Sequence, residues 1–438
     1  MKCFFIILRL MAGIFLPAIL LAQSTDPLEI AKGAERWLSS QRKSSAQGYY
    51  WPDIRDSSAS TTELYSGNSG VLLFYMELFA ATGDNKYGDV AIRAADHISS
   101  TLPTTVDANT VGLYTGQAGL VYALHRAFLF FHKEDHRRAM LSALDSLAVF
   151  VRTHRDDAGV ANDVVYGWAG IGLTFLYAER EQLRPDAGEL AREVGRILLD
   201  RQVPVHDDVQ WPMYMADTAK GFFMPNFSHG TAGVAYFLAR LYDHTGDRDL
   251  LKASIGAARH LLDITTPEGM IRHAEPDSAA MDRYYVSWCH GPVGTARLYH
   301  QLWATTGDSV WEHALKLAAS ADMSCGMPEQ HTAGYWNNVS FCCGDAGVAV
   351  FYLDMFRIRH DSTYLDFANK MLDALASRAD VRGGTWQWEQ AENRRQPELL
   401  QAQTGLMQGA AGIGLAFLRA DALRRGRKPV IRLPDDPF

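Results

Sequence analysis

Hydrophobic residues recur along the chain in runs that each follow a pair of glycines. The runs are apolar on every side, as in residues 71–76 and 120–124, which is typical of helices buried all round. Seven Gly-x-x-Gly pairs begin these runs: Gly67–Gly70, Gly116–Gly119, Gly167–Gly170, Gly230–Gly233, Gly291–Gly294, Gly344–Gly347 and Gly409–Gly412. Their spacing of about 50 to 65 residues fits a repeat of two helices with their loops.

A second class of predicted helix lies between these runs and is apolar along one stripe only. Steps of three and four residues between apolar positions indicate helices on the outside of the fold. Two such stripes are Met140, Leu144, Leu147 and Val151, and Leu251, Ile255, Ala258 and Leu262. Thr-Gly-Asp joins a run to the next amphipathic helix at 82–84, 245–247 and 306–308. Glycine suits the end of one helix and aspartate caps the start of the next.

These patterns predict an all-α fold, an α/α toroid in which seven inner helices are surrounded by seven outer helices. Strand signals are sparse and no linker divides the chain, so a single domain is expected over residues 26–438. In such a ring the seven glycine loops lie at one end of the axis. Polar residues beside the glycines would therefore converge there.

The N-terminal sequence and the net charge indicate where the protein is located and which partners it binds. Residues 1–22 are mostly apolar after Lys2 and are followed by a polar stretch, which predicts a secretory signal peptide. An uncleaved membrane anchor is the alternative. We expect an exported protein, periplasmic or secreted, with no stable membrane insertion after cleavage. The net charge of -8 and the absence of a basic run argue against nucleic acid as a partner.

Three cysteines stand directly before two of the glycine pairs. Cys289 precedes Gly291, and Cys342 and Cys343 precede Gly344. Thiols just outside a helix start meet the positive end of the helix dipole, which favours thiolate. Three thiolates suit a soft tetrahedral metal such as zinc. The alternative is a disulfide that includes Cys289 or Cys325, because an exported protein with four cysteines often forms disulfides.

Four motifs give the chain a resemblance to the lanthionine synthetase C-like (LanC-like) family, the cyclases that make thioether rings in peptides. Residues 227–233 (FSHGTAG) resemble the family's Ser-His-Gly loop, and residues 287–294 (SWCHGPVG) resemble its Trp-Cys-x-Gly loop. Residues 342–347 (CCGDAG) resemble its second metal loop, and residues 405–414 resemble its closing repeat. The resemblance covers essentially the whole mature chain and implies a seven-plus-seven helix toroid with Zn²⁺ at one end.

By position, the resemblance makes Cys289 and Cys342 zinc ligands. Cys343 stands where most members of the family have histidine, and some multifunctional members have the same three-cysteine set. We therefore predict Cys289, Cys342 and Cys343 as the metal ligands. His290 adjoins Cys289 but is not expected to bind the metal.

The resemblance also implies catalytic residues. His229 matches the catalytic histidine of the family, and Asp163 matches the acidic residue that partners it. The family's arginine has no clear match, because Tyr285 occupies its position and Arg283 lies two residues earlier. We include Arg283 in the predicted site, which is then His229, Asp163 and Arg283.

These residues predict a zinc-dependent enzyme that adds a thiol to a dehydroamino acid to form a thioether. The expected substrate is a dehydrated peptide, attacked by its own cysteine or by a small thiol. One alternative is an exported toroidal glycoside hydrolase or lyase, with carboxylates such as Asp163, Asp345 and Glu389. Another is a non-catalytic, zinc-stabilised binding protein, which would not need His229.

Overall fold

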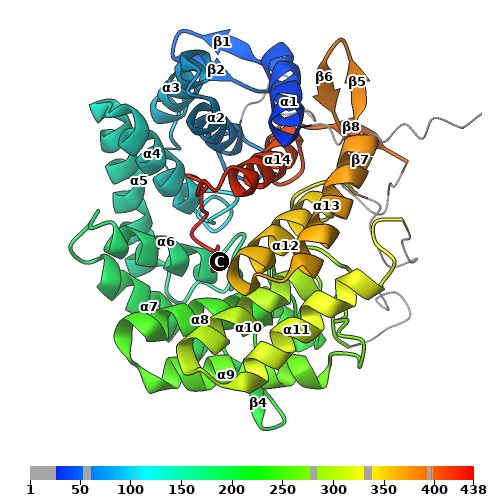
Figure 1. The fold of residues 1–438 in the computed structure, drawn as a ribbon. Coiled ribbons are helices and arrows are strands. Elements are labelled where there is room, and N and C mark those ends of the chain that lie inside the picture. Colours follow the sequence, from blue (N-terminus) through cyan, green and yellow to red (C-terminus); the bar gives the residue numbers. More distant parts are fainter. Residues whose placement is uncertain are drawn as a thin grey trace, which may run out of the picture.

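Fourteen helices in the described part of the chain form two concentric rings (Figure 1). The computed structural model describes residues 26–52, 61–103, 105–276, 284–329, 338–391, 396 and 398–438. The inner ring consists of α2 (Asn68–Thr82), α4 (Gln117–Phe131), α6 (Trp168–Arg180), α8 (Thr231–Thr245), α10 (Pro292–Thr306), α12 (Asp345–Arg359) and α14 (Ala410–Arg424). The predicted α/α toroid of seven inner and seven outer helices is confirmed.

The outer helices follow the inner ones in sequence, with one exception that closes the ring. They are α1 (Pro27–Gln41), α3 (Asn85–Ser100), α5 (Glu134–Thr153), α7 (Ala187–Asp200), α9 (Arg248–Asp263), α11 (Ser309–Ser324) and α13 (Ser362–Ser377). Each packs on the inner helix before it, except α1, which packs on α14. The first helix of the chain thus covers the last inner helix.

Antiparallel pairs of short strands lie in three of the connections between the described helices. The pairs are β1 (Lys43–Ser45) with β2 (Gly48–Tyr50), β3 (Val203–Val205) with β4 (Asp208–Gln210), β5 (Asp380–Arg382) with β6 (Thr385–Gln387), and β7 (Glu389–Ala391) with β8 (Leu400–Ala402). A short 3₁₀ helix, η1 (Met215–Lys220), precedes α8. None of the described helices has both the length and the apolar character needed to cross a bilayer.

Burial separates the two helix classes much as predicted. In α2 the side chains of Leu72, Phe74 and Met76 are all fully buried although they point in different directions. In α5 the stripe from Met140 to Val151 is buried as expected.

The predicted stripe of α9 is confirmed only in part: Ala258 is fully buried, and the other three residues lie at the edge of the buried face. Leu250 and Leu261 are buried there, whereas Leu251 and Ile255 are only partly covered. The buried face of α9 also carries small residues, including Gly256, so a search for large apolar side chains places the stripe one residue off.

The turns between inner and outer helices use the predicted caps. Gly83, Gly246 and Gly307 adopt left-handed conformations, with φ of 68°, 71° and 70°. The aspartate that follows each glycine accepts a hydrogen bond from a backbone N–H in the first turn of the next helix. His132 and His360 hold the same left-handed position after α4 and α12, with φ of 52° and 56°. A histidine is not the usual signal for such a cap, so the sequence did not reveal these two joints.

Each glycine loop folds back over the start of its inner helix. A Cβ added to the second glycine of any pair would lie within 1.7 to 2.6 Å of a carbonyl oxygen six residues earlier. Real Cβ atoms do not approach oxygen so closely, so only glycine fits at these positions. The repeated pairs therefore fix the loops tightly at one end of the ring.

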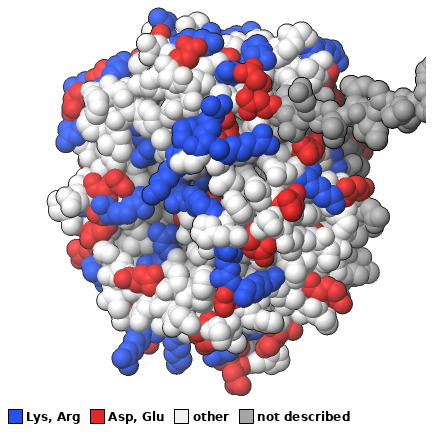
Figure 2. Space-filling model, viewed as in Figure 1, with Lys and Arg blue, Asp and Glu red and all other residues white. Residues whose placement is uncertain are grey.

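The C-terminal segment turns into the middle of the ring (Figure 1). Glu77 accepts hydrogen bonds from the backbone of Val430 and Ile431, and the Phe438 ring lies 4.8 Å from that of His300. Arg297 donates to the backbone oxygen of Asp435. These partners lie in the middle or C-terminal half of inner helices, so the segment fills the axis from the end away from the glycine loops. In Figure 2, which has the same view as Figure 1, Lys and Arg gather near the middle of the face that is seen.

Candidate functional site

The candidate site is formed by two equivalent positions of the seven glycine loops. Two residues before the first glycine stand Tyr65, Tyr114, Val165, Ser228, Cys289, Cys342 and Met407. One residue before it stand Ser66, Thr115, Tyr166, His229, His290, Cys343 and Gln408. Because the loops repeat around the axis, these side chains meet at one end of the ring although they are far apart in sequence.

Backbone hydrogen bonds connect most of these loops to their neighbours. The first set of positions forms a chain of N–H to O=C bonds: Tyr65 to Tyr114, Tyr114 to Val165, Ser228 to Cys289, Cys289 to Cys342, Cys342 to Met407 and Met407 to Tyr65. Among the described residues, no such bond connects Val165 with Ser228. This joint lies between the loops of Asp163 and His229, and the side chains of those two residues bridge it instead.

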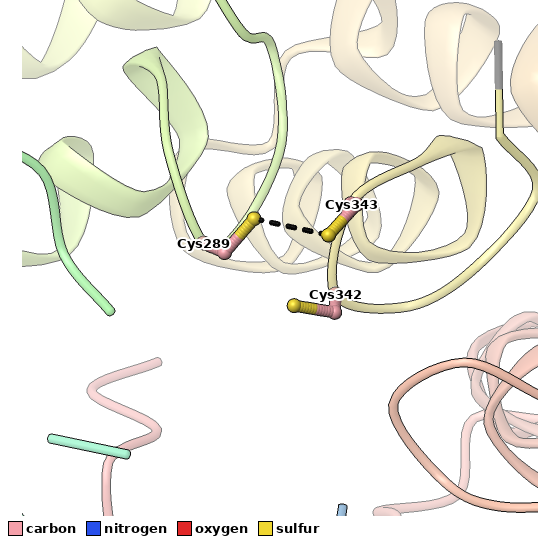
Figure 3. Close-up of side chains that lie close together, drawn as sticks. All are labelled: Cys289, Cys342 and Cys343. Carbon is pink, nitrogen blue, oxygen red and sulfur yellow. Dashed lines mark hydrogen bonds between the residues drawn. The ribbon is translucent and has the colours of Figure 1, made fainter. Parts of the chain in front are cut away.

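Cys289, Cys342 and Cys343 bring their sulfur atoms together (Figure 3). All three sulfurs lie within 4.8 Å of one another, and those of Cys289 and Cys343 are 3.3 Å apart. A disulfide would require about 2.05 Å, so these sulfurs are not joined. Cys289 and Cys342 are buried, and Cys343 is partly exposed. Each cysteine precedes the glycine that caps α10 or α12, as predicted.

The three thiols differ in their acidity. Burial opposes ionisation of Cys289, but hydrogen bonds from the other two thiols and the nearby His290 hold its pKa well below the usual range. Burial, followed by the hydrogen bond with Cys289, raises the pKa of Cys342 well above the usual range. The hydrogen bond with Cys289 is also the main cause that raises the pKa of Cys343. Without a cation, the cluster therefore favours one thiolate beside two thiols.

A histidine–aspartate pair lies next to this cluster. His229 Nδ1 is 2.7 Å from Asp163 Oδ2, while Asp163 Oδ1 accepts a hydrogen bond of 2.7 Å from the backbone N–H of Tyr166. Asp163 is fully buried, whereas the His229 side chain is 22% exposed. A buried carboxylate on Nδ1 fixes the orientation of the ring and leaves Nε2 for another partner.

Aromatic and imidazole rings contact His229 and His290 in series. The His229 ring stacks on Tyr166 at 5.5 Å and lies 5.5 Å from His290, which adjoins Cys289. His290 in turn lies 4.3 Å from His273, whose ring contacts Tyr285 at 4.9 Å. Burial, followed by the charge of Asp163, raises the pKa of Tyr166 to about 12, so its phenol stays neutral.

Comparison with known proteins identifies the family. The profile described as "Lanthionine synthetase C-like protein" matches residues 58–431, which is most of the chain. The chain belongs to the lanthionine synthetase C-like family. The resemblance found in the four motifs is thereby confirmed.

Solved structures confirm the fold of this LanC-like chain. A structure titled "Nisin cyclase" is similar over 90% of this chain and 98% of its own, with a TM-score of 0.62 and 16% identity. An inactive variant of an α-1,6-mannanase from Salegentibacter sp. HEL1_6, in complex with α-1,6-mannotriose, matches over 91% of this chain and 99% of its own. Its TM-score is 0.50 and its identity is 13%. At these identities both likenesses establish the toroid alone.

The donor set of this LanC-like chain fits a zinc ion. Four ligands at about 2.3 Å in a tetrahedron place neighbouring sulfurs about 3.8 Å apart. The sulfur separations here, from 3.3 Å to at most 4.8 Å, bracket that value. A dication would also allow all three thiols to ionise, since it supplies the charge that the buried cluster lacks.

The structure thus brings together five of the six predicted site residues, and their roles remain predictions. Arg283 lies outside the described residues. Cys325 does not belong to the sulfur cluster. It follows α11, and its thiol donates to the backbone oxygen of Asp322. Of the carboxylates in the hydrolase alternative, Asp163 binds His229, Asp345 pairs with Arg378, and Glu389 is exposed.

Sequence reasoning missed the polar residues of the first and last loops. Tyr65 donates a hydrogen bond of 3.3 Å to Cys342 Sγ, and Gln408 Nε2 lies 3.7 Å from Cys343 Sγ. Both occupy the two positions before the glycine that elsewhere carry the cysteines and histidines. Their positions in the repeat place them near the cysteines, but residue type alone gave no reason to assign them a role.

Proposed function

We propose that this protein is a zinc-dependent enzyme that adds a thiol to the β-carbon of a dehydroamino acid, forming a thioether. The observation that carries the proposal is the placement of three convergent sulfurs beside a histidine–aspartate pair, in adjacent loops of one ring end. Membership of the LanC-like family supports the same reaction. The sulfurs supply a metal site, and the pair supplies a proton donor.

Cys289, Cys342 and Cys343 would hold the zinc. A zinc ion with three protein ligands lowers the pKa of a thiol bound at its fourth position, which makes that thiol a better nucleophile. Cys289 and Cys342 are buried while Cys343 is partly exposed, so a thiol from solvent would reach the cluster from the side of Cys343.

His229 would donate the proton that the α-carbon receives. The reaction breaks the S–H bond of the thiol and the π bond of the dehydroamino acid, and it forms an S–Cβ bond and a Cα–H bond. The electron pair of the π bond moves toward the neighbouring carbonyl and returns when Cα is protonated, so no atom is lost. Asp163 on Nδ1 orients the imidazole so that Nε2 can deliver a proton to Cα. Asp163 is therefore a positioning residue.

The substrate class follows from this chemistry. We propose a dehydroalanine or dehydrobutyrine residue within a peptide, attacked either by a cysteine of that peptide or by a small thiol. The predicted signal peptide adds that the reaction takes place outside the cytoplasm, in the periplasm or in secreted form.

The test combines zinc analysis with a thiol-addition assay. The purified protein is incubated with glutathione and a dehydroalanine-containing peptide, and the adduct is measured by mass spectrometry. We expect about one zinc per chain, and a His229→Ala variant that keeps the zinc but loses about 10²- to 10⁴-fold in rate. His244→Ala is the matched control, because His244 lies at the other end of the same helix, α8, and pairs with Glu179.

The outcomes separate the candidate functions. A zinc-free active protein would contradict the proposed mechanism. A protein that holds zinc but forms no adduct above background, with or without His229, would instead be the zinc-stabilised binding protein. Cleavage of a glycan without thiol addition would favour a hydrolase, for which the mannanase likeness supplies only the fold.

A further inference from the structure

A chain of hydrogen bonds leads from Gln390 in β7 through Gln408 and Tyr65 to the sulfur cluster. Gln390 Nε2 donates to the side-chain oxygen of Gln408 at 2.6 Å and to its backbone oxygen at 2.5 Å. Gln408 Nε2 donates to the hydroxyl of Tyr65 at 2.7 Å. The Tyr65 hydroxyl then contacts Cys342 Sγ at 3.3 Å.

The chemistry of these groups fixes the direction of the line. An amide nitrogen can only donate, so the oxygen of Gln408 must accept from Gln390, and its nitrogen must point at Tyr65. The Tyr65 hydroxyl accepts that bond and has a single proton of its own, which is left for the sulfur of Cys342. Gln390 and Gln408 are 1% and 3% exposed, so water does not compete for these bonds.

We infer that Tyr65, oriented by Gln408 and Gln390, is a positioning residue that donates a hydrogen bond to the Cys342 thiolate and draws electron density from a three-sulfur metal site. Three thiolates place more negative charge on a metal than two thiolates and an imidazole. A hydrogen bond to sulfur removes part of that charge, and partners of metal ligands change metal affinity by about 10- to 100-fold. The inference rests on the proposed zinc site and concerns residues that bind no metal themselves.

The chain provides a matched control for Tyr65. Tyr114 occupies the same position in the next glycine loop, but its hydroxyl donates to Asp435 Oδ1 at 2.9 Å and not to a sulfur. Replacing either tyrosine by phenylalanine removes one hydroxyl at the same place in the repeat. Of these two changes, only Tyr65→Phe should alter the properties of the bound metal, because only Tyr65 donates to a sulfur.

The experiment uses the full chain loaded with Co²⁺ in place of zinc, because cobalt bound to thiolate absorbs through sulfur-to-metal charge transfer. In Tyr65→Phe the thiolate loses a hydrogen bond and gives up an electron more easily, so the band should move to lower energy. Gln408→Met should move it the same way by a smaller amount, and Tyr114→Phe should leave it in place. Competition with a chelator should show about a tenfold loss of Co²⁺ affinity in Tyr65→Phe.

Each result decides a different question. A parent protein without the charge-transfer band overturns the three-sulfur site and with it the role of Tyr65. A parent with the band, whose position is the same in Tyr65→Phe and Gln408→Met, overturns only the inference about Tyr65. If Tyr65→Phe fails to fold, Gln390→Met decides the outcome, because it removes the partner that orients Gln408 but keeps both Tyr65 and the side chain of Gln408 beside Cys343. The band should again move to lower energy, and an unmoved band overturns the inference.

Discussion

The two ends of the inner helices are built from different chemistry. At the N-terminal ends, the glycine loops gather three thiols, two histidines and a buried aspartate. At the C-terminal ends, basic residues such as Arg180, Arg357 and Arg424 stand in the last helical turns, and the C-terminal segment supplies acidic partners. The helix dipole favours negative groups at the first end and positive groups at the second.

The difference supports the proposal that the loop end is the binding end. At the far end, the charges are paired within the chain. Arg419 contacts Asp436, and Arg297 donates to the backbone oxygen of Asp435. The Asp435 carboxylate also accepts a hydrogen bond from the Tyr114 hydroxyl. At the loop end, the three sulfurs lie within 4.8 Å of one another, and His290 lies beside Cys289. The far end is held together by charge pairs within the chain, and the loop end is where we propose that a cation and a substrate bind.

Removing a sulfur tests the loop end with the largest effect. We expect Cys289→Ala and Cys342→Ala to lose essentially all bound zinc, because two remaining thiolates do not complete a closed donor set. Metal analysis of the purified variants measures this. Cys325→Ala is the control and should keep the zinc of the parent, and a Cys289→Ala protein with a full zinc complement would disprove the ligand assignment.

Changing Asp163 tests whether the pair at the open joint orients His229. We expect Asp163→Asn to keep its zinc and to lose about 10²-fold in the rate of thiol addition, since an amide cannot stabilise the protonated imidazole. The pH profile of kcat/KM should shift as well. Asp157→Asn makes the same change in the same loop region, where the Asp157 carboxylate accepts a hydrogen bond from the backbone N–H of Gly159, and should leave the rate unaltered. A pH profile that is identical in Asp163→Asn and the parent would rule out the positioning role.

Breaking the charge pairing tests the far end. Asp435→Ala removes one of two acidic neighbours of the buried Arg297 and the acceptor of the Tyr114 hydroxyl, which should lower the free energy of unfolding by about 1 to 3 kcal/mol. Urea unfolding measures this loss. The zinc content of the folded variant should not change, because Asp435 belongs to the C-terminal segment and the three sulfurs belong to two glycine loops. Loss of zinc in folded Asp435→Ala would show that the two ends are not independent.

Acid should weaken the far end through His300, which packs against Phe438. Burial, followed by the charge of Arg359, lowers the pKa of His300 to about 4. An unfolded histidine titrates near 6.5, so the unfolded chain takes up this proton first as the pH falls. The stability that neutral His300 contributes is present above pH 6.5 and is lost between about 6.5 and 4, by up to about 3 kcal/mol. His300→Phe should flatten this part of the stability profile relative to the parent, and equal slopes would contradict it.

The repeat made the fold predictable from sequence. Seven glycine pairs at regular intervals, each before an apolar run, indicate both the helix pairs and the shared end of the loops. The α9 stripe was partly misplaced because small residues such as Ala253 and Gly256 form part of its buried face. The closure of the ring by α1 on α14, and the filling of the axis by the last residues, depend on contacts between distant segments that no local pattern records.

The site was predictable as far as its residues are chemically distinctive. Cysteines and a histidine beside glycines stand out in any sequence, and the structure brings them together. Tyr65, Gln408 and Gln390 were missed because tyrosine and glutamine are common in cores and surfaces alike, and only their hydrogen bonds reveal a link to the sulfurs.

X-ray absorption at the zinc edge tests the central claim most directly, because it reports the atoms around the metal in the purified protein. We predict three sulfur neighbours at about 2.3 Å and one lighter oxygen or nitrogen neighbour, with a fourth sulfur replacing the lighter atom when a thiol substrate is added. Zinc surrounded only by oxygen and nitrogen, or the absence of zinc altogether, would contradict the account.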